Sequence, residues 1–567
     1  MRHPLLALTL LLPTALALTS PSNRLQSLHA AALRDRATAA RARHRPLADE
    51  APQRRSLDAS SPYHTNATAA FAVDGAAFPN VTFDIGESYA GLLPIDDGDS
   101  GRELFFWFVP TANEAADEEI VIWLNGGPGC SSMYGFFKEN GPVNWMAGQY
   151  QPVKNHYAWT NVSNVVWIEQ PVGTGYSRGK PNATSEADVA AQFAGFWKNF
   201  VDLFELQNRK VYITGESYAG MYVPYIADHM IELDDPTYFN VSGIMIYDPS
   251  IGHDTVTGDA PTLSLVDNNR PSFPFNDTFS EHIRNMSAAC GYDDFVSEGL
   301  TYPPKGPFGP PPGAFPNGSV TPDCAVLDEV FTAIFLLNPC FNIYQVSQLC
   351  PIQWDVLGFP YSSFYFPPGY QEPYFNRSDV KALLHAPPDA NWKVCTDTDV
   401  FVGDDGDTSP PSGLTGGPLA RVAEATNNVI VGHGSYDMVL ILNGTLLTLQ
   451  NLTWNGAQGF SAPPDEPFYV PYHDAPFEES LSGAGVFGSW GADRGLTFVA
   501  IELAGHAVPG FTQAAGLRHL ELLLGRIGNL SEVSGFSTQP GYPQPDVPLG
   551  RGTTPVQAVL GGGGYGR

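Results

Sequence analysis

A serine flanked by small residues stands at Ser217, within the run Gly-Glu-Ser-Tyr-Ala-Gly over residues 215–220. A β-rich run, residues 211–214, precedes this serine, and a helix-compatible stretch follows it. A serine on a sharp strand-to-helix turn is exposed for attack, and small neighbours relieve the crowding there. The pattern therefore indicates a serine nucleophile that forms a covalent acyl intermediate.

The same six residues occur a second time, over residues 86–91, with Ser88 at the matching position. Leu92-Leu93-Pro94 and an acidic turn follow Ser88, which disfavours the start of a helix there. We therefore predict that Ser88 is a structural residue in an early hairpin and that Ser217 is the nucleophile.

A glycine-rich run, residues 125–129, directly follows the expected strand 120–124. Backbone N–H groups after a strand can point at a forming oxyanion, and removing one such donor typically costs about 2.7–4 kcal/mol. In the α/β-hydrolase fold the other donor is the N–H of the residue after the nucleophile. We expect the N–H groups of Gly127 and Tyr218 to form the oxyanion hole.

The nucleophile needs a histidine base and a carboxylate, which in this fold follow it in the order acid, then histidine. Asp437 comes after the expected strand 428–431 and a short turn. His506 follows the expected strand 496–503, in a turn of small residues before a helix. The chain has 13 histidines, so a single one indicates little. The alternatives for the base are His433, His253 and His156.

Apolar patterning alternates between strand-like and helix-like stretches, which is typical of an α/β fold with a mostly parallel sheet. The expected strands are 103–109, 119–124, 164–169, 211–214, 244–247, 428–431 and 496–503. The expected helices are 188–204, 222–233 and 514–526.

The alternation stops at about residue 258, where a segment rich in Pro and Tyr begins that carries five of the six cysteines. We interpret 258–404 as an insertion or cap, and 56–257 with 405–530 as the catalytic domain. A Pro/Gly-rich tail, expected to be disordered, occupies 531–567.

The first 17 residues have the pattern of a signal peptide: a basic start, an apolar run too short to span a membrane, and a small-x-small site. Residues 18–55 carry eight arginines and three acids and end in a dibasic pair. We therefore expect a cleaved basic pro-segment there, or else a basic arm that remains attached.

The chain after residue 55 is strongly acidic, with 20 basic and 56 acidic residues. Such an acidic body argues against nucleic acid or an anionic membrane as partner. No other stretch is long and apolar enough for a membrane span.

Twelve Asn-x-Ser/Thr sequons behind a signal peptide predict a heavily glycosylated product, secreted or held in an acidic compartment such as a vacuole. They are Asn66, Asn80, Asn161, Asn182, Asn240, Asn276, Asn285, Asn317, Asn376, Asn443, Asn451 and Asn529. The even number of cysteines fits disulfides in an oxidising compartment. No cysteine pair has zinc-ligand spacing and no His-x-x-x-His occurs, so we expect no metal, and we expect no cofactor.

Three segments together resemble the signatures of the serine carboxypeptidase family. They are Trp-Leu-Asn-Gly-Gly-Pro-Gly-Cys-Ser-Ser over 123–132, the Ser217 run, and Ala-Gly-His-Ala-Val-Pro over 504–509. The run Glu-Gln-Pro-Val-Gly-Thr-Gly-Tyr-Ser over 169–177 resembles a fourth. The resemblance extends from about residue 80 to 530 in the family's order. It implies an α/β-hydrolase fold and a triad of Ser217, Asp437 and His506.

The resemblance also implies a clamp for the substrate's terminal carboxylate, made by Asn125, the Gly126 N–H, Glu139 and Glu216. Two glutamates facing a carboxylate would repel it unless they hold protons, so we expect the pair to titrate as a unit with at least one raised pKa. Binding should then weaken as the pH rises, which predicts an acidic optimum. The family also pairs Cys130 with a distant cysteine, best matched by Cys395; the remaining four, Cys290, Cys324, Cys340 and Cys350, would pair among themselves.

The expected activity is the release of C-terminal amino acids from peptides and proteins. Ala507 and Tyr134 depart from residues that many relatives carry beside the base and after the glycine-rich run, which leaves the preferred C-terminal residue open. The alternatives are an acyltransferase or esterase on the same fold and a non-catalytic secreted glycoprotein. The intact triad and both glutamates argue against them.

Overall fold

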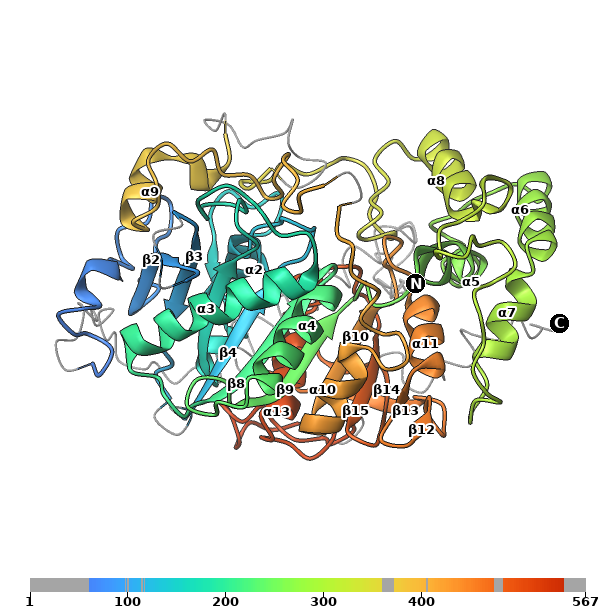
Figure 1. Ribbon diagram of the computed structural model, residues 1–567. Coiled ribbons are helices and arrows are strands. Elements are labelled where there is room, and N and C mark those ends of the chain that lie inside the picture. The colour runs from blue at the N-terminus through green and yellow to red at the C-terminus, as the bar shows by residue number, and fades with distance from the viewer. Residues whose placement is uncertain are drawn as a thin grey trace, which may run out of the picture. The chain divides into compact units, whose positions relative to one another are not determined.

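The fold is built on an eleven-stranded sheet whose centre is parallel and whose edges are antiparallel (Figure 1). The structure is a computed structural model that describes residues 61–544 apart from 97, 99–100, 114–115, 117, 359–371, 404–405 and 474–482. The expected signal peptide, the expected pro-segment and the end of the tail lie outside the described residues. The strands across the sheet are β1 (Ala72–Val73), β2 (Ser88–Pro94), β3 (Glu103–Val109), β7 (Asn164–Glu169), β4 (Glu119–Leu124), β8 (Lys210–Glu216), β9 (Val241–Tyr247), β10 (Val429–Gly434), β15 (Leu496–Ile501), β14 (Gly485–Asp493) and β13 (Glu466–Val470).

Two short strand pairs lie outside this sheet: β5 (Val143–Asn144) with β6 (Val153–Lys154), and β11 (Thr453–Trp454) with β12 (Ala457–Gln458). The described α-helices are α2 (Met133–Lys138), α3 (Glu186–Phe204), α4 (Ala219–Glu232), α5 (Thr262–Asn268), α6 (Asp277–Ala289), α7 (Tyr292–Gly299), α8 (Val326–Leu337), α9 (Ser378–Leu383), α10 (Pro418–Thr426), α11 (Leu442–Asn451), α12 (Val508–Phe511) and α13 (Gln513–Leu523).

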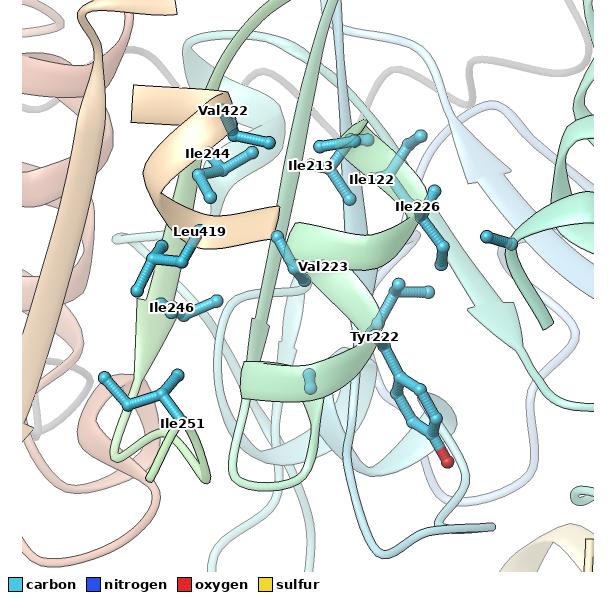
Figure 2. Close-up of a cluster of buried hydrophobic side chains, with 14 of the residues drawn as sticks. Ile122, Ile213, Tyr222, Val223, Ile226, Ile244, Ile246, Ile251, Leu419 and Val422 are labelled. Atoms are coloured by element: carbon cyan, nitrogen blue, oxygen red, sulfur yellow. The ribbon is translucent and has the colours of Figure 1, made fainter. Parts of the chain in front are cut away.

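Alternating side chains of the central strands feed two hydrophobic cores, one on each face of the sheet. On one face, Ile122, Ile213 and Ile244 pack against α3, α4 and α10. Figure 2 shows this packing, with Val223 of α4 and Leu419 of α10 beside the strand side chains. On the other face, the neighbouring residues of the same strands join α2 and α13. Because both faces are covered, the middle of each of these strands carries apolar side chains on both faces.

The predicted α/β-hydrolase architecture is confirmed, and each predicted strand and helix is present within a few residues of its expected ends. The antiparallel strand β14 was not predicted. Its sequence, Gly-Val-Phe-Gly-Ser-Trp-Gly-Ala-Asp, contains three glycines, which weaken strand patterning. It pairs with β15 and β13 and extends the sheet beyond the parallel region.

Between β9 and β10 the described chain contributes helices but no strand to the large sheet. Figure 1 shows α5 to α8 grouped at one end of the sheet. A separate small core around Ile283, Val330 and Phe341 holds these helices together. Disulfides Cys290–Cys324 and Cys340–Cys350 close two loops within the same segment. All described residues belong to one compact unit.

The predicted glycosylation sites differ in the solvent exposure of their asparagines. Eight of the asparagines are exposed: Asn66, Asn80, Asn161, Asn182, Asn276, Asn285, Asn317 and Asn529. Asn443 is only 1 % exposed within α11, so the prediction of a glycan at this position is corrected: the folded chain has no room for one. The side-chain amides of Asn376 and Asn451 are half-buried and bind the backbones of Trp392 and Phe308, which disfavours glycans there as well. None of the described helices combines the length and apolar character needed to cross a bilayer.

Candidate active site

Ser217 lies on a sharp turn between strand β8 and helix α4. Its φ angle is +64°, a left-handed value that residues with a β-carbon rarely adopt and that typifies a strained functional turn. Small neighbours make the turn sterically feasible: a β-carbon on Gly215 would lie 2.3 Å from the Leu124 carbonyl oxygen, and one on Gly220 would lie 2.7 Å from the Ser250 nitrogen. Ser217 is half-exposed on this turn.

Ser88, at the matching place in the repeated motif, lies in strand β2 and is fully buried. Strand β2 pairs antiparallel with β3, so the prediction of a structural residue in an early hairpin is confirmed. Residues 86–91 therefore have the same sequence as residues 215–220 but do not form a strand-turn-helix unit.

The glycine-rich loop after β4 lies against the Ser217 turn. A β-carbon on Gly126 would lie 2.3 Å from the Tyr218 nitrogen, so only glycine permits this close approach. In the described part of the chain, neither the Gly127 N–H nor the Tyr218 N–H donates a hydrogen bond to a protein acceptor. Both donors are therefore available for an oxyanion beside Ser217.

Asp437 and His506 meet at the carboxyl ends of β10 and β15. The His506 Nδ1 lies 2.7 Å from Asp437 Oδ2, and both side chains are buried. The Tyr436 N–H, one residue before Asp437, donates to the Ala504 carbonyl in the loop that carries His506. Because β8, β9, β10 and β15 are parallel neighbours, their carboxyl ends bring this pair to the same edge as Ser217.

Of the alternative bases, His433 also lies near Asp437, at 3.8 Å between Nε2 and Oδ2. Its Nε2 is, however, 2.8 Å from the Leu440 carbonyl oxygen, and its ring is fully buried. Burial lowers the pKa of His433 to about 4, so it is neutral and held in place. His506 is the histidine that has an aspartate on Nδ1 and borders the open pocket.

Asn125 joins the two glutamates of the predicted clamp. Its Nδ2 donates to Glu139 Oε1 at 3.1 Å and to Glu216 Oε1 at 2.9 Å. The Trp123 indole N–H holds the Asn125 Oδ1 at 2.8 Å, which sets the orientation of the amide. Oε2 of each glutamate is buried and has no hydrogen-bond partner among the described residues.

Both clamp glutamates have raised pKa values. Burial raises the pKa of Glu139 to about 7, against the lowering effect of bonds from its neighbours. Burial and then the charge of Glu139 raise the pKa of Glu216 well above its ordinary value. The pair is therefore protonated in acidic solution, when each can donate a hydrogen bond to a carboxylate.

Two disulfides lie beside this machinery. Cys130, at the end of the glycine-rich loop, is bonded to Cys395, the pairing that the family resemblance implied. Backbone bonds flank it, from Ser131 N to the Val394 carbonyl and from Thr396 N to the Gly129 carbonyl. The loop closed by Cys340–Cys350 contains Tyr344, whose carbonyl accepts from the His506 N–H at 2.8 Å. This disulfide-closed loop thus helps to position His506.

A pocket of about 120 Å³ opens between Glu216 and His506. Tyr134 and Ala507, the two departures noted in the sequence, both line it. Lys138 and Asp355 also line it, and they form a buried ion pair at 2.7 Å. This pair could not be predicted from the sequence, because its two residues lie far apart in the chain and belong to no motif.

Asp248, His433 and Asp437 form the one group of side chains, among the described residues, whose donor atoms are close enough to be considered as metal ligands. Asp437 is already bonded to His506, and the His433 Nε2 faces a carbonyl oxygen, which accepts hydrogen bonds only. We therefore assign the group no metal.

Comparisons with known proteins agree with this geometry. The profile of the family described as serine carboxypeptidase matches residues 79–525. A probable serine carboxypeptidase of Arthroderma benhamiae is 49 % identical over 476 residues, covering 82 % of this chain and 88 % of that protein. The serine-type carboxypeptidase F of Aspergillus niger is 45 % identical over 463 residues, covering 79 % of this chain and 86 % of that protein.

Among solved structures, the prohormone-processing carboxypeptidase Kex1(delta)p of Saccharomyces cerevisiae superposes with a TM-score of 0.62 at 21 % identity, covering 82 % of this chain and 98 % of that one. This match shows a common fold. The family match and the two fungal relatives confirm the resemblance seen in the signature segments. The chain belongs to the serine carboxypeptidase family, whose members hydrolyse peptide bonds.

Proposed function

We propose that this chain releases C-terminal amino acids from peptides and proteins, through an acyl-enzyme on Ser217 and best at acidic pH. His506 takes the Ser217 proton as the serine attacks the last peptide carbonyl. Asp437 holds the imidazole in the productive tautomer, and the N–H groups of Gly127 and Tyr218 stabilise the oxyanion. His506 then protonates the leaving amine, and water hydrolyses the acyl-enzyme.

The observation that carries this proposal is the buried cluster of Asn125, Glu139 and Glu216 beside the nucleophile. A triad alone does not distinguish an exopeptidase from an esterase. Two protonated carboxyl groups held by one amide offer donors that match a terminal carboxylate, together with the Gly126 N–H. An esterase or an acyltransferase has no need for such a group, so the cluster favours the carboxypeptidase.

The test is to supply an N-blocked dipeptide as the free acid and as the C-terminal amide, from acidic to neutral pH. We expect release of the last residue from the free acid at acidic pH and much slower cleavage of the amide. Equal cleavage of both forms would discard the clamp and point to a general esterase or amidase. The processed, glycosylated protein from a secretory host is the right sample, since we also propose that the product is secreted.

The pocket between Glu216 and His506 should hold the side chain of the leaving residue, because the clamp and the base bracket that residue. Lys138 has three N–H donors, of which one is used on Asp355 Oδ2, while Asp355 Oδ1 accepts from Leu357 N. The Lys138–Asp355 pair therefore has more unused hydrogen-bond donors than unused acceptors to offer a side chain bound in the pocket. We propose that C-terminal side chains with acceptor oxygens, such as glutamine and glutamate, are favoured in this pocket.

We expect the double variant Lys138→Met/Asp355→Asn to lower the ratio of kcat/KM for C-terminal glutamine over its near-isostere methionine by about tenfold, the worth of one hydrogen bond to a charged donor. Replacing both residues avoids leaving one charge buried and unpaired, which typically costs about 3–5 kcal/mol. Tyr134→Phe, which keeps the ion pair, is the matched control. An unchanged glutamine-to-methionine ratio in the double variant would contradict the assignment.

A further inference from the structure

A second buried carboxyl group, Asp248, stands at the end of strand β9 next to the triad aspartate. Its backbone N–H donates to the Gly432 carbonyl at 2.9 Å, and its Oδ1 accepts from the Gly434 N–H at 2.8 Å. Asp248 therefore ties β9 to the end of β10, where the turn that carries Asp437 begins. Its φ angle of +44° is a left-handed value that costs a residue with a β-carbon, as at Ser217.

The hydrogen bonds of the two aspartates leave one oxygen unsatisfied. Asp437 Oδ2 is bonded to His506, and Asp437 Oδ1 accepts from Val439 N at 2.8 Å. Asp248 Oδ1 is taken by Gly434. Asp248 Oδ2 is buried and has no donor among the described residues. One carboxylate oxygen of Asp248 lies within 4.8 Å of one of Asp437, and hydrogen bonding with Asp437 is among the causes that raise the pKa of Asp248. A carboxylate oxygen in that position would be costly, whereas a protonated one would have a ready acceptor.

Among the described residues, no lysine or arginine forms an ion pair with either carboxyl group. The His433 Nε2 lies 3.4 Å from Asp248 Oδ1, but it faces the Leu440 carbonyl and must carry its hydrogen toward that oxygen. Burial keeps the His433 ring neutral, as described above. Burial and the charge of Asp437 raise the pKa of Asp248 well above its ordinary value. Among the described residues, the ionisable groups that face Asp248 are Asp437, His433, Glu139, Glu216 and Tyr247, with His506 behind Asp437.

We propose that Asp248 is a positioning residue of the triad, which keeps a proton on Oδ2 and donates it in a hydrogen bond to the carboxylate of Asp437. A bond of this kind favours the ionised form of its acceptor. It would therefore keep Asp437 charged in the acidic range in which Glu139 and Glu216 need their protons. The two requirements of the site, a neutral clamp and a charged triad acid, are then met at the same pH.

The inference rests on the proposed role of Asp437, and two variants of Asp248 test it. Asp248→Asn keeps an acceptor for Gly434 and a donor for Asp437. We expect it to keep kcat within about threefold of the wild type and to leave the acidic limb of the kcat/KM profile in place. Asp248→Ala removes both bonds. We expect its acidic limb to move up by about one pH unit and its kcat/KM at acidic pH to fall about tenfold.

An infrared measurement distinguishes a proton held on Asp248 Oδ2 from a purely structural role of Asp248, and it does not require an active enzyme. In the infrared difference spectrum of wild type minus Asp248→Asn at mildly acidic pH, we expect the carbonyl stretch of one protonated carboxyl group. This readout also serves if Asp248→Ala does not fold. The absence of that band, or an Asp248→Asn enzyme as impaired as Asp248→Ala, would overturn the proposal.

A further variant, Asp437→Asn, distinguishes failure of this inference from failure of the proposed function. Asp437→Asn should lower kcat by about 10⁴-fold if Asp437 is the triad acid. Full activity in Asp437→Asn would refute the triad itself. The carbonyl band in the wild type minus Asp248→Asn spectrum, together with an inactive Asp437→Asn enzyme, supports both the triad and the proton on Asp248. Absence of the band with an inactive Asp437→Asn enzyme overturns this inference and leaves the triad standing.

Discussion

Replacing Ser217 with alanine is expected to lower kcat by about a million-fold, leaving only the slow turnover that oxyanion donors and substrate binding support. The nucleophile cannot be substituted from nearby, because the other copy of the motif buries Ser88 in strand β2. Steady-state hydrolysis of an N-blocked dipeptide at acidic pH measures the effect. KM should change little, since alanine removes no contact of the clamp.

Ser88→Ala is the matched control, because it makes the same change in the same six-residue motif. Its kcat should stay within about threefold of the wild type, as for a residue outside the reacting groups. A Ser217→Ala enzyme with more than a trace of activity, in a preparation free of wild type, would mean that another group forms the acyl-enzyme.

KM for a peptide with a free C-terminus is expected to rise steeply above neutral pH, by about tenfold per pH unit once the clamp has ionised. Glu139, with a pKa of about 7, holds its proton below that pH and loses it above, and the raised pKa of Glu216 likewise favours its protonated form in acidic solution. Protonated, the two glutamates donate to the substrate carboxylate. Ionised, they repel the carboxylate. The same rise should be absent for the amidated peptide, which carries no charge at its end.

The double variant Glu139→Gln/Glu216→Gln tests the cause of this rise. Glutamine keeps an N–H donor and is neutral at every pH, so KM of the variant should stay flat through the neutral range. The two single variants should lie between it and the wild type. A wild-type KM that stays flat, or a double variant whose KM rises as in the wild type, would show that the clamp does not bind through shared protons.

Much of the site could be predicted because its parts are local signatures. The turn at Ser217, the glycine-rich loop at 125–129 and the turn at His506 each combine small residues with a preceding apolar strand. Local context also separated Ser217 from Ser88, because only one of the two matches begins a helix. The clamp roles came from the family resemblance, since a lone glutamate such as Glu139 is more often a solvated surface charge.

The parts that sequence did not predict depend on contacts between distant segments. Lys138 and Asp355 lie on opposite sides of Ser217 in the chain and meet only because the chain around Asp355 folds back against the end of α2. Asp248 reads as an ordinary residue after a strand until the parallel pairing of β9 with β10 brings it to Asp437. The sequon at Asn443 likewise could not be excluded before α11 was seen to be buried.

The assignment of Ser217 as the nucleophile can be tested by finding which residue carries the acyl group. The glycosylated wild-type protein would be treated with an organophosphorus fluoride, which phosphorylates an activated serine, digested with a protease, and mapped by mass spectrometry. We expect one adduct, on the peptide that contains Ser217, formed in step with the loss of peptidase activity and absent from His506→Ala. An adduct on the Ser88 peptide, or full loss of activity with Ser217 unmodified, would contradict the assignment.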